Sequence, residues 1–256
     1  MWWLLGCQQG VPADPAPSPP PEPPALEAPA HHLGALPEGF VDVREAVPGL
    51  RFDLRYSTDH NPTGQPLPGH GASAAWLREE VAEALLQVVQ NLETEELGLI
   101  LFDAYRPDRA EQAQAAWLKR TGHQHLIDDG HIRVESTHPL GTAVDVTLIH
   151  LPSGEPFDMG TPWGAWGEAS RYEAAKWPPM EHRALLRTHM GHSGFRGVKY
   201  AWWHFYIPSE KLVRRDVPYG CFEAPEGEWV VPEGWENPTY KPEPTPEPRP
   251  CPPDES

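Results

Sequence analysis

The pattern of apolar and polar residues predicts a mixture of strands and helices between about residues 38 and 210. Residues 38–58 carry short apolar groups in near-alternation, which is typical of loop and strand. From residue 74 to residue 93, apolar side chains recur every three or four positions, which predicts a helix with one buried face. Ser73 immediately precedes this stripe and is placed to cap the helix. We interpret the stripe as core.

A continuous apolar run at residues 98–102 is best explained as a buried strand. It leads directly into Asp103-Ala-Tyr-Arg106-Pro107, and Asp108 is placed to cap a second helix over about residues 109–119. Arg106 therefore lies where a strand gives way to a helix. Taken alone, such an arginine is either a structural ion-pair residue or a site residue.

Alternation over residues 142–150 predicts a further strand. Val144 and Val146 fall on one face and Asp145 on the other, so the strand is expected to bury its valines and to turn Asp145 toward a polar surface. His138 precedes the strand, and Gly141 allows a tight change of direction between them. Because the chain has 13 histidines, a turn with a surface aspartate explains this spacing equally well.

The rest of the middle region is less regular. Residues 154–167 contain glycines, prolines and two tryptophans without a period, and they predict a loop that lines a pocket. Residues 180–190 predict a helix closed by Gly191, and the aromatic segment 199–207 predicts a strand.

Composition separates this middle region from two proline-rich ends. Of the 33 prolines, ten lie in residues 8–37 and ten in residues 224–256. Such segments favour extended conformations and cannot bury a core. We therefore predict a linker over residues 8–37, one domain over residues 38–223 and an acidic tail over residues 224–256.

Charge and cysteine content exclude some functions. The formal net charge of −17 argues against nucleic acid as a partner, because nucleic-acid binding depends on Lys and Arg neutralising phosphates. The chain has three cysteines, Cys7, Cys221 and Cys251, and no CxxC pair, so a thiolate zinc site is unsupported. Pairing of Cys221 with Cys251 stays open.

Residues 1–7 are short and apolar, and Leu4-Leu-Gly-Cys7 resembles a bacterial lipobox, in which the cysteine carries a lipid. The segment lacks a basic region, and its apolar run is shorter than the ~7–15 residues of a signal peptide. A truncated lipoprotein signal and a chance apolar start both fit. With the linker that follows, the first interpretation implies attachment to a membrane through Cys7 and an extracytoplasmic location in the bacterial envelope.

Three side chains offer the ligands of a catalytic zinc site. His138, Asp145 and the distant His204 supply two imidazoles and a carboxylate, and a catalytic zinc needs three protein ligands with a fourth position left for water.

Several motifs, in order along the chain, resemble those of the D-alanyl-D-alanine dipeptidases of the vancomycin-resistance type. These zinc peptidases are related to the D-Ala-D-Ala carboxypeptidases and to hedgehog domains. The likeness covers about residues 40–210 and rests on five motifs: Phe102-Asp-Ala-Tyr-Arg-Pro107, Ser136-x-His-x-x-Gly-x-Ala-x-Asp145, Met159-Gly-Thr161, Gly194-Phe195 and Trp202-Trp-His-Phe205.

The resemblance implies an α+β fold with a central, mostly antiparallel sheet flanked by helices, and one zinc ion per chain. It implies zinc ligation by His138, Asp145 and His204. It further implies that Arg106 stabilises the oxyanion and that Ser136 lines the site for D-Ala-D-Ala or a related small peptide.

Two positions depart from the family pattern. The family motif Glu-Trp-Trp-His has a glutamate that moves the proton of the attacking water, and this chain has Ala201 there. The family also has an aspartate that binds the free amino group of the dipeptide, and this chain has Gly164 there. Glu135, Glu155 and Glu168 are possible substitutes, and the spacing favours none of them.

These departures leave two functional hypotheses. In one, the protein is a zinc dipeptidase of the envelope whose activity is impaired by the missing base. In the other, it is a zinc-binding pseudoenzyme that binds wall peptides or a protein partner without cleaving them. A third possibility is a relic site without metal, which the retention of all three ligands disfavours.

Overall fold

The computed structural model describes residues 36–70, 74–209 and 212–219. The predicted segments 1–7, 8–37 and 224–256 lie wholly or almost wholly outside these residues, as do Ser73 and the three cysteines. The strands are β1 (Phe40–Asp42), β2 (Arg51–Phe52), β3 (Trp76–Arg78), β4 (Leu97–Asp103), β5 (Ala143–His150), β6 (Arg196–Gly197) and β7 (His204–Tyr206). The α-helices are α1 (Val43–Ala46), α2 (Glu79–Glu93), α3 (Asp108–Arg120), α4 (His125–Asp128) and α5 (Pro179–His192).

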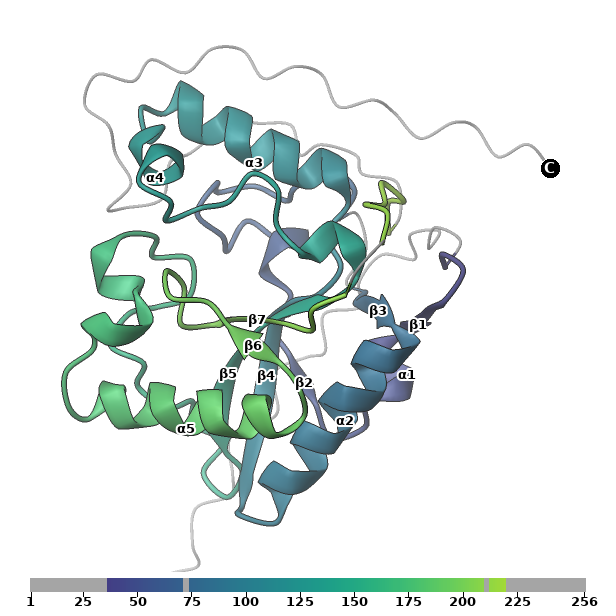
Figure 1. Ribbon diagram of the computed structural model, residues 1–256, viewed down its shortest axis with the longest axis vertical. Coiled ribbons are helices and arrows are strands. Elements are labelled where there is room, and N and C mark those ends of the chain that lie inside the picture. Colours follow the sequence, from purple (N-terminus) through teal and green to yellow (C-terminus); the bar gives the residue numbers. More distant parts are fainter. Residues whose placement is uncertain (1–35, 71–73, 210–211, 220–256) are drawn as a thin grey trace, which may run out of the picture.

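A five-stranded sheet in the order β2-β4-β5-β7-β6 forms the centre of the molecule (Figure 1). β2 pairs with β4 in parallel, and the other three pairings are antiparallel. β1 and β3 form a separate antiparallel pair. The domain is thus α+β with a mixed sheet, and most strand pairings within the sheet are antiparallel.

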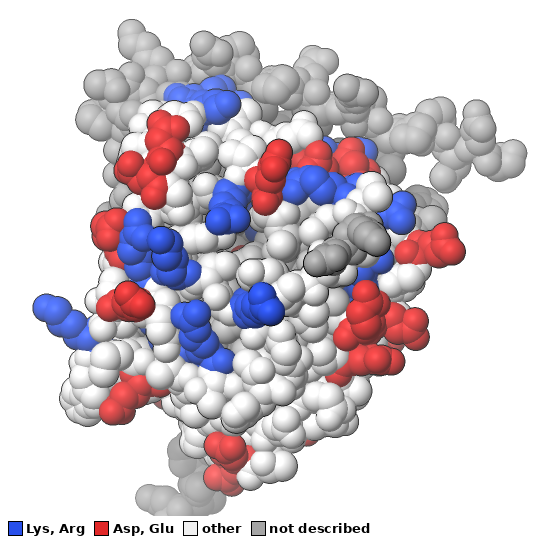
Figure 2. Space-filling view, viewed as in Figure 1, with Lys and Arg blue, Asp and Glu red and all other residues white. Residues whose placement is uncertain are grey.

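Helices α2 and α5 pack against each other and against the central strands β4 and β5, while α3 lies beyond one end of the strands (Figure 1). The six fully buried residues of α2 are Val81, Ala82, Leu85, Val88, Val89 and Leu92. Its first turn carries the exposed Glu79 and Glu80, whose charges complement the positive end of the helix dipole. Acidic side chains also gather over this end of α2 in Figure 2.

The predicted start of the helix at residue 74 is wrong. Residues Trp76–Arg78 form β3, which pairs with β1 so that Trp76 lies opposite Asp42, and the helix begins only at Glu79. Both Trp76 and Leu77 are buried. Their burial continues the apolar stripe of the helix, so periodicity alone does not reveal the change from strand to helix.

The predicted polar surface for Asp145 is also wrong. Strand β5 lies between β4 and β7, and its first seven residues are all buried. Asp145 is only 3% exposed. The polar positions of this strand therefore face the interior, where they contribute to a site.

Other predicted boundaries need smaller corrections. Helix α3 begins at Asp108 with Pro107 as its N-cap, so Asp108 does not cap it. Helix α5 continues through Gly191 to His192. In the segment 199–207, only His204–Tyr206 is strand. Of the described residues, no helix is both long and apolar enough to cross a membrane.

Candidate metal centre and pocket

Three elements bring His138, Asp145 and His204 together. His138 begins the short 3₁₀ helix η2 (His138–Leu140), and Asp145 in β5 lies directly opposite His204 in β7. His138 Nε2 is 3.2 Å from Asp145 Oδ1 and 3.1 Å from His204 Nδ1. His204 Nδ1 is 3.0 Å from Asp145 Oδ1. One atom of each buried side chain therefore faces the same point.

The three side chains fit a small, tetrahedrally coordinated cation. With zinc–ligand bonds of about 2.0–2.2 Å, tetrahedral ligands are about 3.3–3.6 Å apart, close to the distances between these three atoms. The outward atoms have partners of their own: His138 Nδ1 contacts the Ala104 carbonyl at 2.5 Å, and His204 Nε2 contacts Thr137 Oγ1 at 3.3 Å. Such contacts fix the ring tautomers so that the inward nitrogens keep their lone pairs.

Asp145 is held in the same way. Its Oδ2 accepts a hydrogen bond of 3.1 Å from the indole nitrogen of Trp163, which leaves Oδ1 for the cluster. Burial would raise the pKa of Asp145, but the neighbouring His138 and His204 outweigh burial and lower it. Burial lowers the pKa of His204. The aspartate is therefore ionised and His204 neutral near pH 7. Burial would lower the pKa of His138, but Asp103 and Asp145 raise it, so a metal ion competes with a proton at this ligand.

Arg106 is fixed beside this cluster. Its Nε and Nη2 donate to Asp103 Oδ2 at 3.0 and 2.7 Å, and its guanidinium lies 4.6 Å from the centre of the Tyr56 ring. Nη2 is 4.0 Å from Asp145 Oδ2. Burial would lower the pKa of Arg106, but Asp103, Tyr56 and Asp145 raise it, so the guanidinium stays charged.

Asp103 is a site residue that the sequence reasoning missed. Besides holding Arg106, its Oδ2 lies 3.3 Å from His138 Nδ1, so one carboxylate contacts both the arginine and a candidate ligand. Arg106 and His138 lower the pKa of Asp103 against the effect of burial. The available signal was its place in the motif Phe102–Pro107, directly after the apolar run 98–102; in the structure it is the last residue of β4.

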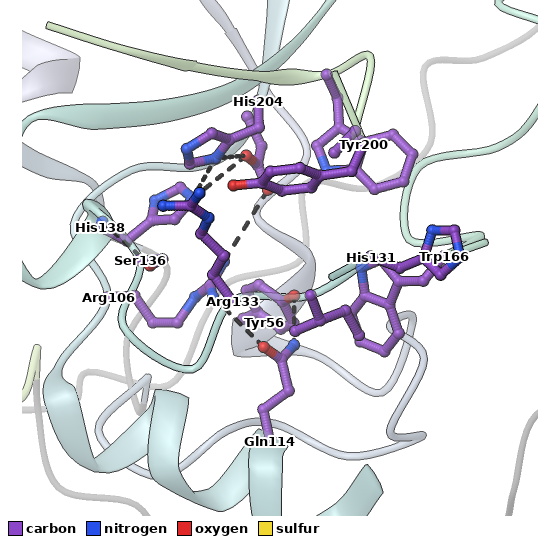
Figure 3. A pocket seen from close by; sticks show the side chains of 14 residues that line it. Tyr56, Arg106, Gln114, His131, Arg133, Ser136, His138, Trp166, Tyr200 and His204 are labelled. Atoms are coloured by element: carbon purple, nitrogen blue, oxygen red, sulfur yellow. Dashed lines mark hydrogen bonds and ion pairs between the residues drawn. The ribbon is translucent and has the colours of Figure 1, made fainter. Parts of the chain in front are cut away.

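The cluster opens on a pocket between the sheet and α3 (Figure 3). Ser136 and Ala201, both singled out from the sequence, are on its wall. The predicted pocket loop 154–167 contributes Trp166 to the wall and Trp163 to Asp145. Sequence reasoning gave no role to the remaining lining residues, which are Tyr56, Gln114, His131, Ile132, Arg133, Tyr200 and Trp203.

Ser136 is held in place by hydrogen bonds on both sides. Its backbone N–H donates to Glu111 Oε1 at 2.9 Å, and its hydroxyl oxygen accepts from the backbone N–H of His138 at 3.3 Å. The serine is thereby positioned next to a candidate ligand on the pocket wall.

Ala201 faces the same pocket as His204 although an ideal strand would place them on opposite faces. The chain turns at Trp202 and Trp203, and the backbone N–H of His204 bonds to the carbonyl of Ala201 at 3.3 Å. This turn is what allows Ala201 and His204, three residues apart, to face the same pocket. Ala201 is buried and contributes only a methyl group.

None of the three glutamates considered as substitutes lines the pocket. Glu168 pairs with Arg171 at 2.9 Å and with His131 at 3.3 Å, and Glu155 is exposed beyond the far end of β5. Glu135 is exposed as well. Among the described residues, Asp145 is thus the one carboxylate on the pocket wall.

Gly164, the second departure, sits where a side chain does not fit. Its φ is +81°, and an added Cβ would lie 2.7 Å from Cγ of Pro62. No aspartate can occupy this position without a shift of the loop or of Pro62.

A buried His–Asp–His cluster next to a fixed arginine, in the pocket of an α+β domain, defines a candidate metal-binding site. Residues 37–224 match a peptidase family described as D-ala-D-ala dipeptidase, and the chain belongs to this family. The family predicted from the ordered motifs is therefore confirmed.

Two D-alanyl-D-alanine dipeptidases are relatives of this chain. The D-alanyl-D-alanine dipeptidase of Enterococcus faecium is 32% identical over 196 residues, which cover 71% of this chain and 94% of that protein. The D-alanyl-D-alanine dipeptidase of Escherichia coli is 32% identical over 192 residues, covering 73% of this chain and 94% of that protein. The solved structure of the LdcB LD-carboxypeptidase matches with a TM-score of 0.41 and 16% identity, over 69% of this chain and 71% of that one.

Proposed function

We propose that the protein binds one zinc ion through His138, Asp145 and His204 and acts on D-Ala-D-Ala or a related peptidoglycan peptide, with slow hydrolysis. The observation that carries this proposal is the cluster itself. Its three inward atoms lie 3.0–3.2 Å apart, and they open on a pocket that also holds Arg106. Family membership supplies the class of substrate.

Zinc, when bound, supplies a Lewis acid that polarises a carbonyl and lowers the pKa of a bound water. Arg106 uses Nε and one N–H of Nη2 on Asp103, and Nη1 donates to Gln114 Oε1 at 3.5 Å. The N–H groups that these bonds leave over are available to an oxyanion in the pocket. Because Asp103 already fixes the guanidinium, little reorganisation is needed when negative charge develops. Ser136 contributes a hydroxyl to the substrate wall.

Proton transfer is the step for which the described pocket wall lacks the family's glutamate. A methyl group stands at residue 201, and the wall offers no carboxylate besides Asp145 among the described residues. General acid–base catalysis contributes about 10²–10⁴-fold to rate, so hydrolysis slowed by about that factor is expected.

The same observation favours a second candidate function, in which the protein binds wall peptides without cleaving them. The ligand cluster and Arg106 can bind a peptide carbonyl without a base at residue 201, whereas efficient cleavage needs one. The two candidates differ only in whether any peptide bond is broken.

Restoring a carboxylate tests the proposal. Zinc-loaded native protein, Ala201→Glu and Ala201→Gln are compared by the release of D-alanine from D-Ala-D-Ala and from its N-acetylated form. We expect Ala201→Glu to be about 10²–10⁴-fold faster than native protein, and Ala201→Gln to stay near the native rate because an amide cannot accept the proton.

Native turnover at about 1–10³ s⁻¹, as in ordinary enzymes, would show that hydrolysis is not slowed. If none of the three proteins releases D-alanine while native protein still binds peptide, the second candidate function, binding without cleavage, is correct.

We also propose that the protein works in the extracytoplasmic envelope of a bacterium, where such peptides occur. The lipobox-like Leu4-Leu-Gly-Cys7 and the proline-rich segment support this location. Fractionation of cells that express the full chain, with Cys7→Ala as control, tests both the location and the lipid anchor. Recovery of the native protein in the cytoplasm would contradict both.

A further inference from the structure

We infer that the pocket selects a peptide with a free C-terminal carboxylate and an amide-blocked amino group over a free dipeptide, and that Arg133 binds the carboxylate. This inference rests on the proposed function, because it concerns the ligand of the same site. It follows from which charged groups line the pocket and which do not.

Arg133 is a cation on the pocket wall, and no carboxylate of the described residues pairs with it. Its side chain is exposed, and its guanidinium lies 5.8 Å from the centre of the Tyr200 ring. Among the described residues, no acidic group forms an ion pair with it, whereas Arg106 is held by Asp103. Figure 3 shows Arg133 and Tyr200 beside the pair His138 and His204. A guanidinium in this position offers two parallel N–H donors to a carboxylate.

The described pocket wall offers no free carboxylate to a ligand's ammonium group. Of the wall residues in the described part of the chain, Asp145 alone is acidic, and its two oxygens are engaged by the histidines and by Trp163. Gly164 cannot supply an acid either, because a side chain there would meet Pro62.

The charges around the pocket therefore favour the carboxylate end of a peptide ligand over its ammonium end. The wall carries Arg106 and Arg133 against Asp145, and Asp103 behind the wall balances Arg106. A bound divalent cation adds further positive charge. Placing an ammonium group in this pocket would remove it from water beside like charges and without a partner, which is costly. An acylated nitrogen carries no charge, so a blocked amino group avoids this cost.

The ligand class is thus the C-terminal end of a longer peptide. Its chain beyond the amide can lie on the aromatic wall residues Trp166, Tyr200 and Trp203, which offer apolar contact area.

The test measures binding to the zinc-loaded full chain by isothermal titration at several peptide concentrations. The three probes are N-acetyl-D-Ala-D-Ala, D-Ala-D-Ala and the C-terminal amide of N-acetyl-D-Ala-D-Ala. We expect the N-acetylated acid to bind at least tenfold more tightly than either of the others. Arg133→Met should weaken binding of the N-acetylated acid about ten- to hundredfold, as expected for loss of a charge-assisted hydrogen bond.

Arg51→Met serves as the matched control, because Arg51 is an exposed arginine in the edge strand β2 and does not line the pocket. Zinc content is measured in every variant and should be unchanged. Equal or tighter binding of D-Ala-D-Ala, or unchanged binding by Arg133→Met, would overturn this inference and leave the proposed function standing. If zinc is bound and no probe binds, the proposed function fails together with the inference.

Discussion

At the scale of single residues, Asp103 connects the parts of the site. It accepts from Arg106 at 2.7 Å and lies 3.3 Å from His138 Nδ1, and all three groups are buried. The Ala104 carbonyl takes the hydrogen bond of His138 Nδ1, and the Asp103 carboxylate adds negative charge beside that nitrogen, which supports the basicity of a ligating histidine. Asp103 is therefore a positioning residue that acts through Arg106 and His138.

Asp103→Asn should lower zinc affinity about 10–100-fold, because the variant loses the negative charge beside His138 and Arg106. Competition with a chromogenic chelator measures this affinity. Asp53→Asn is the matched control, since Asp53 also accepts from an arginine, Arg55 at 2.7 Å, but at the partly exposed surface. Equal zinc affinities in the two variants would show that Asp103 does not support the ligand.

At the scale of elements, sequence patterns located the segments that are marked by a continuous apolar run or by apolar residues at helical spacing. The apolar run at residues 98–102 is within β4, and the predicted helices at 109–119 and 180–190 are within α3 and α5. The start of α2 was misplaced because pairing of β3 with β1 overrides helical periodicity. The extent of β7 was overestimated because aromatic residues that favour strands instead form a buried turn at Trp202 and Trp203.

The loop 154–167 shows why composition alone could not define its role. Its tryptophans were expected to line a pocket, but the bond from Trp163 to Asp145 depends on where the loop is held. Gly164 at φ +81° packs its backbone against Pro62, which helps to set that position.

Gly164→Ala should destabilise the protein by about 2–4 kcal/mol, from a residue forced into positive φ and from overlap with Pro62. Gly130→Ala is the matched control, because Gly130 has φ +71° but nothing within 4 Å of an added Cβ. Gly130→Ala should lower the free energy of unfolding by about 1–2 kcal/mol, because only the cost of positive φ applies. Urea denaturation measures both. Equal losses in the two variants would mean that contact with Pro62 does not constrain the loop.

At the scale of the whole molecule, charge is distributed unevenly. The chain has a net charge of −17, yet the pocket carries two arginines and a single carboxylate on its described wall. On the face in Figure 2, basic side chains lie over the middle of the surface between α3 and α5, and acidic ones lie mainly toward its edges. Net charge alone therefore does not predict the sign of the ligand.

The site could be predicted only in part because its residues come from distant segments. The ordered motifs indicated His138, Asp145 and His204, since each lies in a recognisable stretch of sequence. Tyr56, Gln114 and Arg133 carry no such local signal, and only the fold brings them to one pocket. Boundaries of the linker and tails, and the fate of Cys7, stay predictions because they concern residues outside the described part of the chain.

Zinc binding by His138, Asp145 and His204 is tested most directly by metal analysis of purified protein. After loading with zinc and dialysis, native protein should retain about one zinc per chain, and Asp145→Asn should retain far less because the amide loses the ligand charge. Asp158→Asn, at an exposed aspartate outside the pocket, should behave as native. Native protein without bound zinc, or Asp145→Asn with a full complement, would contradict the claim.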